Sequence, residues 1–259
     1  MTRVICNFSR GAASAVATKI ALTKYKGTHE VIVQTAHVAE EHHDGARFQA
    51  DCERWFGVQV AVVRDLKYGA SAREVFRRKR YMVGPHGAPC TKILKREVLN
   101  ASLAPSDLLV LGYTVEEQRR LDDWIDANNG RQCEAPLIDA GLSKTDVLAI
   151  VSRAGIELPL MYRLGFHNNN CIGCVKGGMG YWNKVREHFP ADFEEMAQIQ
   201  ERIGPGANFL RQRSGPLKGQ RFTLRELRPD QGRYPDEPSI ECGASCEFGE
   251  NLIDFGDVA

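Results

Sequence analysis

Short apolar runs alternate with helical patterns through the first part of this chain. The apolar runs cover residues 4–8, 31–35, 59–63, 107–112 and 136–139, and the helical patterns cover residues 14–25, 46–56, 71–80, 92–103 and 144–154. Such alternation is typical of a mostly parallel sheet with helices on both faces. The sequence therefore predicts a Rossmann-like α/β fold.

The sequence changes in character after Gly155, where Gly, Pro, Asn and Cys become frequent. One helix is expected in this part, over residues 192–203, because Gly204 and Pro205 would end it. Regular apolar positions are too few to build a separate core, so this part should wrap over the sheet. We expect an α/β nucleotide-binding domain over residues 1–160 and an irregular, Cys-rich region over residues 161–259.

Composition and charge narrow the classes of protein. With 259 residues and 43% hydrophobic residues, the chain can build an ordinary core, and its formal charge of +1 gives no overall field that favours nucleic acid or membranes. No apolar run approaches the roughly 20 residues that span a bilayer. The N-terminus enters a strand pattern without a signal peptide. We expect a cytoplasmic protein with no membrane partner.

The first strand pattern runs directly into a small, Gly- and Ser-containing loop. A turn of this kind places backbone N–H groups and the positive end of a helix where a phosphate can bind. It is not a Walker loop, because no Gly-Lys-Ser/Thr closes it. The same residues also suit a plain strand-to-helix bend. The candidate phosphate-binding residues are Ser9, Arg10, Gly11, Ala12, Ala13 and Ser14.

Four of the eight cysteines form two close pairs, Cys171 with Cys174 and Cys242 with Cys246, and Cys90 stands upstream. A reducing compartment disfavours disulfides, and thiolates grouped in this way bind a soft metal or an iron–sulfur cluster. A structural zinc ion or a redox dithiol are the alternatives. The isolated cysteines are expected to be buried small hydrophobes. These are Cys6, Cys52 and Cys133.

Five segments resemble, in the same order, those of a known family. They are residues 8–16 (FSRGAASAV), 41–55 (EHHDGARFQADCERW), 89–95 (PCTKILK), 111–120 (LGYTVEEQRR) and 168–176 (NNNCIGCVK). The family is the phosphoadenosine phosphosulfate reductase branch of the adenine-nucleotide alpha-hydrolase superfamily, whose phosphate loop is called the PP-loop. The resemblance covers residues 4 to 203. Phage and bacterial members are the most similar.

This resemblance implies an oxidoreductase that reduces a sulfonucleotide, adenosine phosphosulfate or its 3′-phosphorylated form, beside a [4Fe-4S] cluster. Glu241-Cys242-Gly243 is similar to the family element that carries the nucleophilic cysteine. A thioredoxin-like reductant is the implied partner. The implied cluster ligands are Cys90, Cys171, Cys174 and Cys246, with an exchange of Cys242 and Cys246 left open. The further implied nucleotide contacts are Lys95, Gly112, Arg119 and Arg120.

Two departures from the family pattern leave other functions open. Ala13 stands where many ATP-using relatives have an acidic residue, and Thr114 replaces an arginine of the family element. The alternatives are an ATP-dependent sulfurtransferase that acts on nucleic acid, of the thiolation or phosphorothioation type, and a non-enzymatic nucleotide or cluster sensor. A basic run could contact nucleic acid or form a solvated face. It consists of Arg77, Arg78, Lys79 and Arg80. A homo-oligomer is a further open expectation.

Overall fold

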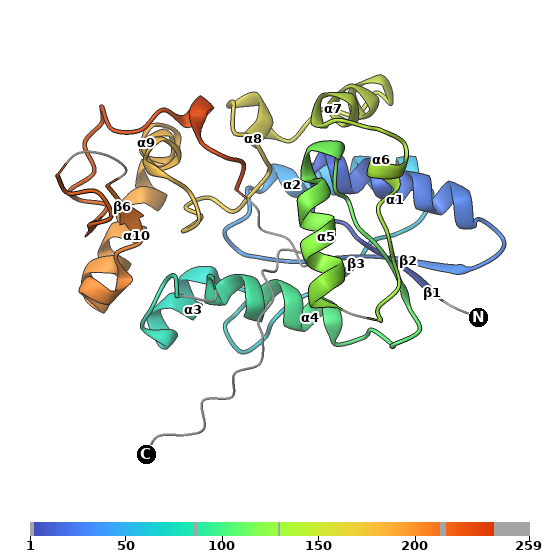
Figure 1. Ribbon diagram of the computed structural model, residues 1–259, viewed down its shortest axis with the longest axis horizontal. Coiled ribbons are helices and arrows are strands. Elements are labelled where there is room, and N and C mark those ends of the chain that lie inside the picture. The colour runs from blue at the N-terminus through green and yellow to red at the C-terminus, as the bar shows by residue number, and fades with distance from the viewer. Residues whose placement is uncertain (1–2, 85–86, 129, 213–215, 241–259) are drawn as a thin grey trace, which may run out of the picture.

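A five-stranded parallel sheet forms the centre of the computed structural model, which describes residues 3–84, 87–128, 130–212 and 216–240. The strand order is β3-β2-β1-β4-β5. Figure 1 labels β1, β2 and β3 of this sheet. The predicted α/β fold with helices on both faces is confirmed. The strands are β1 (Arg3–Asn7), β2 (Glu30–Ala36), β3 (Ala61–Val63), β4 (Leu108–Val110) and β5 (Cys133–Glu134).

The order of the strands reverses between β1 and β4. From β1 the chain continues to β2 and β3 on one side, then crosses back to β4 and β5 on the other. The strands pair in parallel, with Cys6 opposite both Val33 and Val110. In open parallel sheets a ligand binds beyond the carboxyl ends of the strands at such a reversal. The topology therefore points to the loops that follow β1 and β4.

One face of the sheet is covered by four helices that bury the largest apolar cluster of the sheet domain. Residues on this face include Phe8, Phe48 and Val151, none of them more than 1% exposed. Cys6 and Cys52 lie in the same cluster and are fully buried, as predicted, and burial raises the pKa of each thiol to about 12. The helices are α1 (Ala12–Tyr25), α2 (Asp44–Phe56), α6 (Pro136–Asp139) and α7 (Lys144–Arg153).

The other face carries shorter elements. Trp124 of α5 packs with Ile5, Leu109 and Leu111, and half-buried Cys133 lies beside this cluster. In place of the single helix predicted over residues 92–103, a π-helix η1 is followed by a short α-helix. The elements are α3 (Ala72–Lys79), η1 (Thr91–Glu97), α4 (Val98–Asn100), the 3-10 turn η2 (Val115–Glu117) and α5 (Gln118–Ala127).

The expectation of a strand at residues 136–139 is wrong, because these residues form helix α6. Pro136 occupies the start of that helix, where its missing N–H costs nothing. The fifth strand instead comes just before it, at Cys133–Glu134, where Leu109 pairs with Cys133. A proline followed by two apolar residues suits a helix start as well as an edge strand, and Leu137 is fully buried in the helix.

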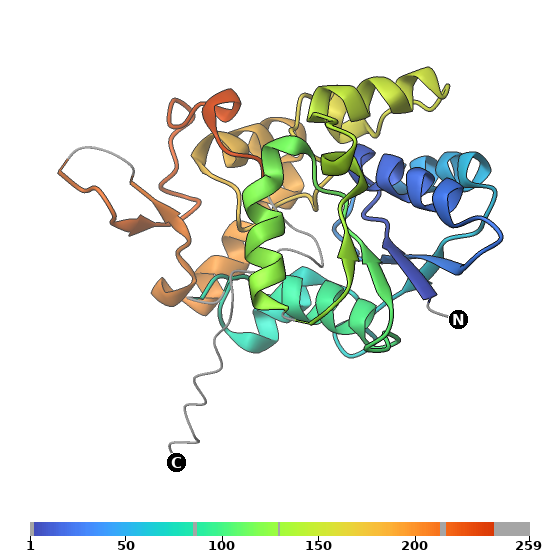
Figure 2. The same cartoon turned by 45° about the vertical axis from the view of Figure 1, so that its right-hand side comes forward.

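The C-terminal region is more regular than predicted, since the single expected helix is one of three. Trp182 and Tyr181 form a buried cluster with Phe193, and this cluster extends to Val75 and Phe76 of α3. The region therefore builds its own core against α3 and does not merely cover the sheet (Figure 2). The elements are α8 (Leu160–Arg163), α9 (Met179–His188), α10 (Pro190–Ile203), β6 (Leu210–Arg211), β7 (Arg221–Phe222) and the turns η3 (Pro205–Ala207) and η4 (Tyr234–Asp236).

Candidate functional site

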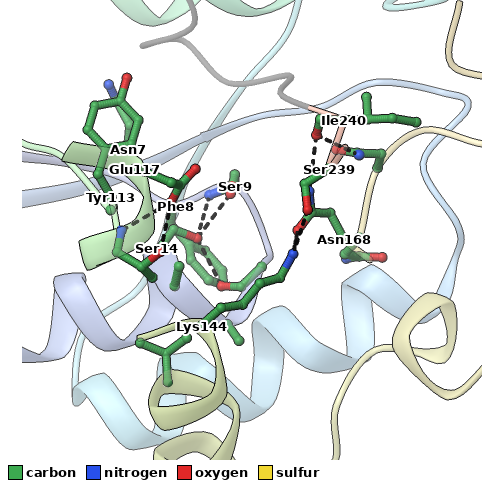
Figure 3. Close-up of a pocket in the computed structure, with 18 of the residues that line it drawn as sticks. Asn7, Phe8, Ser9, Ser14, Tyr113, Glu117, Lys144, Asn168, Ser239 and Ile240 are labelled. Carbon is green, nitrogen blue, oxygen red and sulfur yellow. Dashed lines mark hydrogen bonds between the residues drawn. The ribbon is translucent and has the colours of Figure 1, made fainter. Parts of the chain in front are cut away.

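A cavity of about 490 Å³ lies where the topology predicts it, beyond the carboxyl ends of β1, β2 and β4. Its lining comes from the loop after β1, the end of β2, Glu41, η1 with Leu99, the segment after β4, α7 and the C-terminal region. Figure 3 shows side chains from the loop after β1, the segment after β4 and the C-terminal region around the cavity. The lining residues that the sequence predicted are Ser9, Gly11, Ala12, Ala13, Ser14, Lys95, Gly112 and Arg120.

The loop after β1 is fixed by its two serines. Ser14 Oγ accepts hydrogen bonds from the backbone N–H of Ser9 (3.1 Å) and from Ser9 Oγ (3.0 Å), and it donates to the carbonyl of Gly11 (3.0 Å). Gly11 caps α1 in an extended conformation without a side-chain hydrogen bond. The first turn of α1 therefore points its positive end into the cavity, which is the geometry of an anion site at a helix N-terminus.

Arg10 was predicted to contact the nucleotide, but its side chain turns to α2. Its φ of 57° lies in the left-handed region. The guanidinium donates to Gln49 Oε1 (2.9 Å) and to Glu41 Oε2 (2.9 Å), and Asn169 donates to the carbonyl of Arg10 (2.8 Å). Arg10 therefore holds the loop against Gln49 and Glu41 and does not line the cavity.

Gly112 allows the segment after β4 to approach the start of α1. A Cβ atom at this position would lie 3.0 Å from Ser14 Cα and 3.2 Å from Ser14 N, both of them backbone atoms. Contacts this short are tighter than a side chain tolerates without displacing its neighbour. A glycine at this position therefore sets the spacing between the two loops of the cavity.

Three cations line the cavity. Lys95 forms an ion pair with Glu41 (3.1 Å), and Arg120 pairs with Glu117 while its guanidinium lies 4.5 Å from the centre of the Tyr113 ring. Lys144, which the sequence did not single out, also reaches the cavity. Arg119, also predicted as a nucleotide contact, is exposed and outside the lining of this cavity.

Lys144 is held by two oxygen atoms from the C-terminal region. Its Nζ donates to Asn168 Oδ1 and to Ser239 Oγ, each at 2.9 Å (Figure 3). Burial lowers the pKa of Lys144 below its usual range, with Glu117 and Glu116 acting in the opposite direction. An anion in the cavity would compensate this burial of a cation, so Lys144 is suited to bind one.

A second, much smaller cavity of about 20 Å³ gathers the three described cysteines of the predicted metal site. Cys90, Cys171 and Cys174 line it together with apolar side chains such as Phe76 and Met196. More than 80 residues separate Cys90 from Cys171 in the sequence. Cys242 and Cys246 lie outside the described residues. The fold thus brings distant thiols to one apolar position.

The turn that carries Cys171 and Cys174 is tightly packed. The Tyr181 hydroxyl donates to the carbonyl of Cys171 (2.9 Å) and accepts from the backbone N–H of Cys174 (3.0 Å). Gly173 has a φ of 77°, and a Cβ there would lie 3.3 Å from the Trp182 ring. Among the described residues, no three His, Cys, Asp or Glu side chains are arranged to hold a metal ion. A metal centre at this turn therefore requires a further ligand.

The π-helix η1 joins the two cavities. Cys90 precedes its first residue, Thr91 lines the cysteine cavity, and Lys95 lines both cavities. π-Helical turns occur often at functional sites, because the extra residue in the turn redirects side chains. The predicted phosphate loop and the predicted thiolate site are therefore neighbours, connected by the residues that follow Cys90.

The last described residues lie at the cavity beside the loop after β1. Asn168 Nδ2 and Asn170 Nδ2 both donate to the carbonyl of Ile240, at 3.1 Å and 3.0 Å, and Ser239 bonds to Lys144. Figure 3 shows Ser239 and Ile240 beside Asn168. The segment that leads to Cys242 is thus attached beside the cavity by the Asn-rich turn that precedes Cys171.

Carboxylates pair with two of the four cations of the basic run on α3. Arg77 pairs with Glu74 (2.8 Å) and with Glu195 (2.6 Å), and Arg78 pairs with Glu74 (3.4 Å). Lys79 and Arg80 are exposed at the end of the helix. The two ion-paired arginines give little support to a phosphate-binding surface on α3.

Sequence reasoning missed Lys144, Tyr162, Glu41 and Gln34 as lining residues. Tyr162 lies over the loop, where its hydroxyl accepts from the backbone N–H of Ala12 (3.4 Å). Lys144 reaches the cavity because α7 packs beside α1, and no local motif encodes that packing. Gln34 reaches it from the end of β2. The Asn-rich turn was the one available signal for the C-terminal side of the cavity.

Comparisons with known proteins leave the family unassigned. No family model and no curated protein matches the chain. The solved structures include a similar one, the U34-tRNA thiolase NcsA from Methanococcus maripaludis with its [4Fe-4S] cluster, at a TM-score of 0.41 and 13% sequence identity over 78% of this chain and 72% of that chain. Similarity at this level supports no statement about activity. Membership of the phosphoadenosine phosphosulfate reductase family stays a prediction.

None of the helices that the structure describes is both long and apolar enough to cross a lipid bilayer.

Proposed function

We propose that this protein is an iron–sulfur enzyme that performs sulfur chemistry with an adenine nucleotide. The observation that supports this best is the position of Lys95, which lines both the phosphate-loop cavity and the cavity of Cys90, Cys171 and Cys174. A nucleotide bound at the loop would have its phosphate end beside the thiols. Nucleotide activation and sulfur chemistry could then share one site.

The nucleotide would bind with its phosphates at the first turn of α1. Backbone N–H groups and the hydroxyls of Ser9 and Ser14 would donate to the phosphate oxygens. Lys144, Lys95 and Arg120 would balance the negative charge, since all three line the cavity. A volume of about 490 Å³ is within the range of small-molecule sites.

The cysteine cavity fits a thiolate-bound inorganic centre in ligand type and surroundings. Cys90, Cys171 and Cys174 line one small apolar cavity, and a [4Fe-4S] cluster is held by four cysteines. We assign the fourth ligand to Cys246, which leaves Cys242 as the reactive thiol. A bound cluster would supply a concentrated charge that acts on the thiol and on the anionic substrate nearby.

Reduction of a sulfonucleotide is the first candidate reaction. The Cys242 thiolate attacks the sulfur of the phosphosulfate, the bond from that sulfur to the bridging oxygen breaks, and the nucleotide leaves with its phosphate. An external dithiol of the thioredoxin type then attacks the cysteine sulfur, which releases sulfite and leaves the dithiol oxidised. The attachment of Ile240 beside the cavity favours this reaction, since Cys242 follows two positions later.

ATP-dependent sulfur transfer to nucleic acid is the second candidate. Glu41, Glu116 and Glu117 line the cavity, so carboxylates that could bind Mg²⁺ are present although Ala13 is not acidic. The metal would help to activate the acceptor as an adenylate, which a sulfur nucleophile then displaces. The ion-paired arginines of α3 do not supply the nucleic-acid surface that this reaction needs.

Anaerobic purification followed by iron and sulfide analysis tests the inorganic centre. We expect iron and sulfide in similar amounts and a marked loss of both in Cys90→Ser and Cys171→Ser proteins. Zinc without sulfide would contradict the cluster. Comparing Cys242→Ser with Cys246→Ser identifies the fourth ligand, because only the ligand variant should lose iron.

Substrate assays distinguish the two reactions and the non-enzymatic alternative. Adenosine phosphosulfate or its 3′-phosphorylated form, supplied with thioredoxin, should yield sulfite in a manner that requires Cys242. Adenylation of tRNA or DNA by ATP and Mg²⁺, without sulfite formation, would favour the second candidate. Nucleotide binding without either turnover would indicate a sensor and would contradict an enzymatic role.

Replacing Lys144 with methionine should weaken nucleotide binding about tenfold, since a buried hydrogen bond to a charged group contributes about 1.5–3 kcal/mol. The lowered pKa of Lys144 means that its proton is lost at a lower pH than in an ordinary lysine. Affinity in the unmodified protein should therefore fall as the pH rises toward that value, and this fall should be absent in Lys144→Met. Isothermal titration at several pH values measures both effects.

The matched control for Lys144 is Lys79→Met, because Lys79 lies at the exposed end of α3. This variant should bind the nucleotide normally. Equal affinity in the Lys144→Met protein would show that Lys144 serves only to hold Asn168 and Ser239.

A further inference from the structure

A separate cavity of about 240 Å³ lies between η1, α4, α5 and β4. Its walls come from elements that are distant in sequence, and it shares only Asn7 with the larger cavity. The phosphate loop and the cysteines do not contribute to it. Its lining residues are Asn7, Lys92, Arg96, Glu97, Asn100, Leu109, Leu111, Trp124, Asn128 and Arg131.

The charge of this cavity is strongly unbalanced. Lys92, Arg96 and Arg131 supply three cations, and Glu97 supplies the single carboxylate. A concave site lined by positively charged side chains concentrates anions. The excess of positive charge therefore favours an anionic ligand.

Apolar side chains and amide groups also line the cavity. Trp124 is only 4% exposed and packs with Leu109 and Leu111, while the side-chain amides of Asn100 and Asn128 also face the site. The volume is below the roughly 300 Å³ at which drug-sized pockets begin. A ligand with one charged group and a compact polar body fits this combination.

We propose that this cavity binds a small phosphate ester, whose phosphate is held by Lys92, Arg96 and Arg131. The proposal does not depend on the function assigned to the larger cavity. Its position has a consequence for that cavity, because Lys92 and Arg96 lie on η1 before and after Lys95. A ligand here would contact the same π-helix that joins the nucleotide and cysteine cavities.

Fluorine NMR of the full-length protein labelled with 5-fluorotryptophan tests the proposal. The chain has three tryptophans, so three signals are expected, and Trp124→Phe assigns the one in this cavity. Addition of ribose 5-phosphate should move the Trp124 signal in a saturable manner. Trp55 and Trp182 line neither this cavity nor the nucleotide cavity, so their signals should stay in place.

Variants decide whether the response arises in this cavity. Arg131→Gln and Lys92→Gln should each weaken the binding of ribose 5-phosphate about tenfold, because each removes a charged hydrogen bond to phosphate. Lys79→Gln is the control and should have no effect. A Trp124 response that is unchanged in both Arg131→Gln and Lys92→Gln would overturn the proposal.

Two further outcomes would also overturn it. If Ser14→Ala abolishes the Trp124 response, the ester binds in the nucleotide cavity and Trp124 reports it from a distance. If ribose 5-phosphate has no effect and a single-stranded oligonucleotide moves the signal, the cavity belongs to a nucleic-acid surface. Persistence of the response in Ser14→Ala, with loss in Arg131→Gln, supports a separate site for a small ester.

Discussion

Replacing Trp182 with alanine should lower the free energy of unfolding by about 3–5 kcal/mol, the range for removal of a large buried aromatic side chain. Trp182 is fully buried in α9 and packs edge-on against Phe193, with ring centres 6.0 Å apart, and against Phe209 at 5.4 Å. It also lies directly beneath Gly173, in the turn between Cys171 and Cys174. Urea unfolding followed by circular dichroism measures the loss.

The same variant should disturb the cysteine cavity, since the turn would lose the ring on which it rests. Iron content should therefore fall in Trp182→Ala protein that is still folded. Trp55→Ala is the matched control, because Trp55 is only partly buried on α2 and does not line the cavity of Cys90, Cys171 and Cys174. A loss below about 1 kcal/mol in Trp182→Ala, or an equal loss in the control, would show that this cluster does not support the cysteine turn.

The sequence predicts the sheet well where local patterns and packing agree. The runs that became β1, β2 and β4 are apolar and bounded by helix starts, so their identity does not depend on distant residues. Helix α7 is a similar case. The Ser143 hydroxyl accepts a hydrogen bond from the backbone N–H of Asp146, and the Asp146 carboxylate accepts one from the backbone N–H of Ser143. This local exchange fixes the beginning of the helix.

Helix α9 shows why the C-terminal region could not be predicted. Three glycines surround its start, which locally disfavours a helix. The missing cap comes from Glu237, whose carboxylate accepts from the backbone N–H groups of Gly180 (2.7 Å) and Tyr181 (3.0 Å). The glycines are needed because Tyr234 passes so close that a Cβ on Gly180 would lie 2.4 Å from its backbone nitrogen. A contact across 57 residues leaves no local signal.

The candidate site likewise contains residues that local motifs predict and residues that only the packing of distant elements places there. Its phosphate loop and its cysteine pair are contiguous motifs, so residues 9–14 and Cys171 with Cys174 could be named from sequence. Lys144 reaches the cavity only because α7 packs on α1, and it then meets Ser239 from the far end of the described chain. Arg10 is the opposite case: it belongs to the motif, but Glu41 and Gln49 draw its side chain away.

Replacing Gly112 with valine should weaken nucleotide binding about 100-fold, since a displacement of roughly 1 Å in a positioned site costs about that factor. The Cβ alone would lie 3.0 Å from Ser14 Cα, and the two methyl groups of valine would crowd the first turn of α1 further. That turn carries the N–H groups and the Ser14 hydroxyl on which the proposed phosphate binding depends. Isothermal titration with the nucleotide measures the effect.

A graded series separates this effect from a general loss of stability. Gly112→Ala should weaken binding less than Gly112→Val, because only the Cβ must be accommodated. Gly206→Val is the control, as a Cβ on Gly206 meets no atom within 4 Å. Near-ultraviolet circular dichroism at the titration temperature verifies that each variant is folded. Normal affinity in folded Gly112→Val would mean that the nucleotide does not use the first turn of α1, and the phosphate site would then have to lie elsewhere in the cavity.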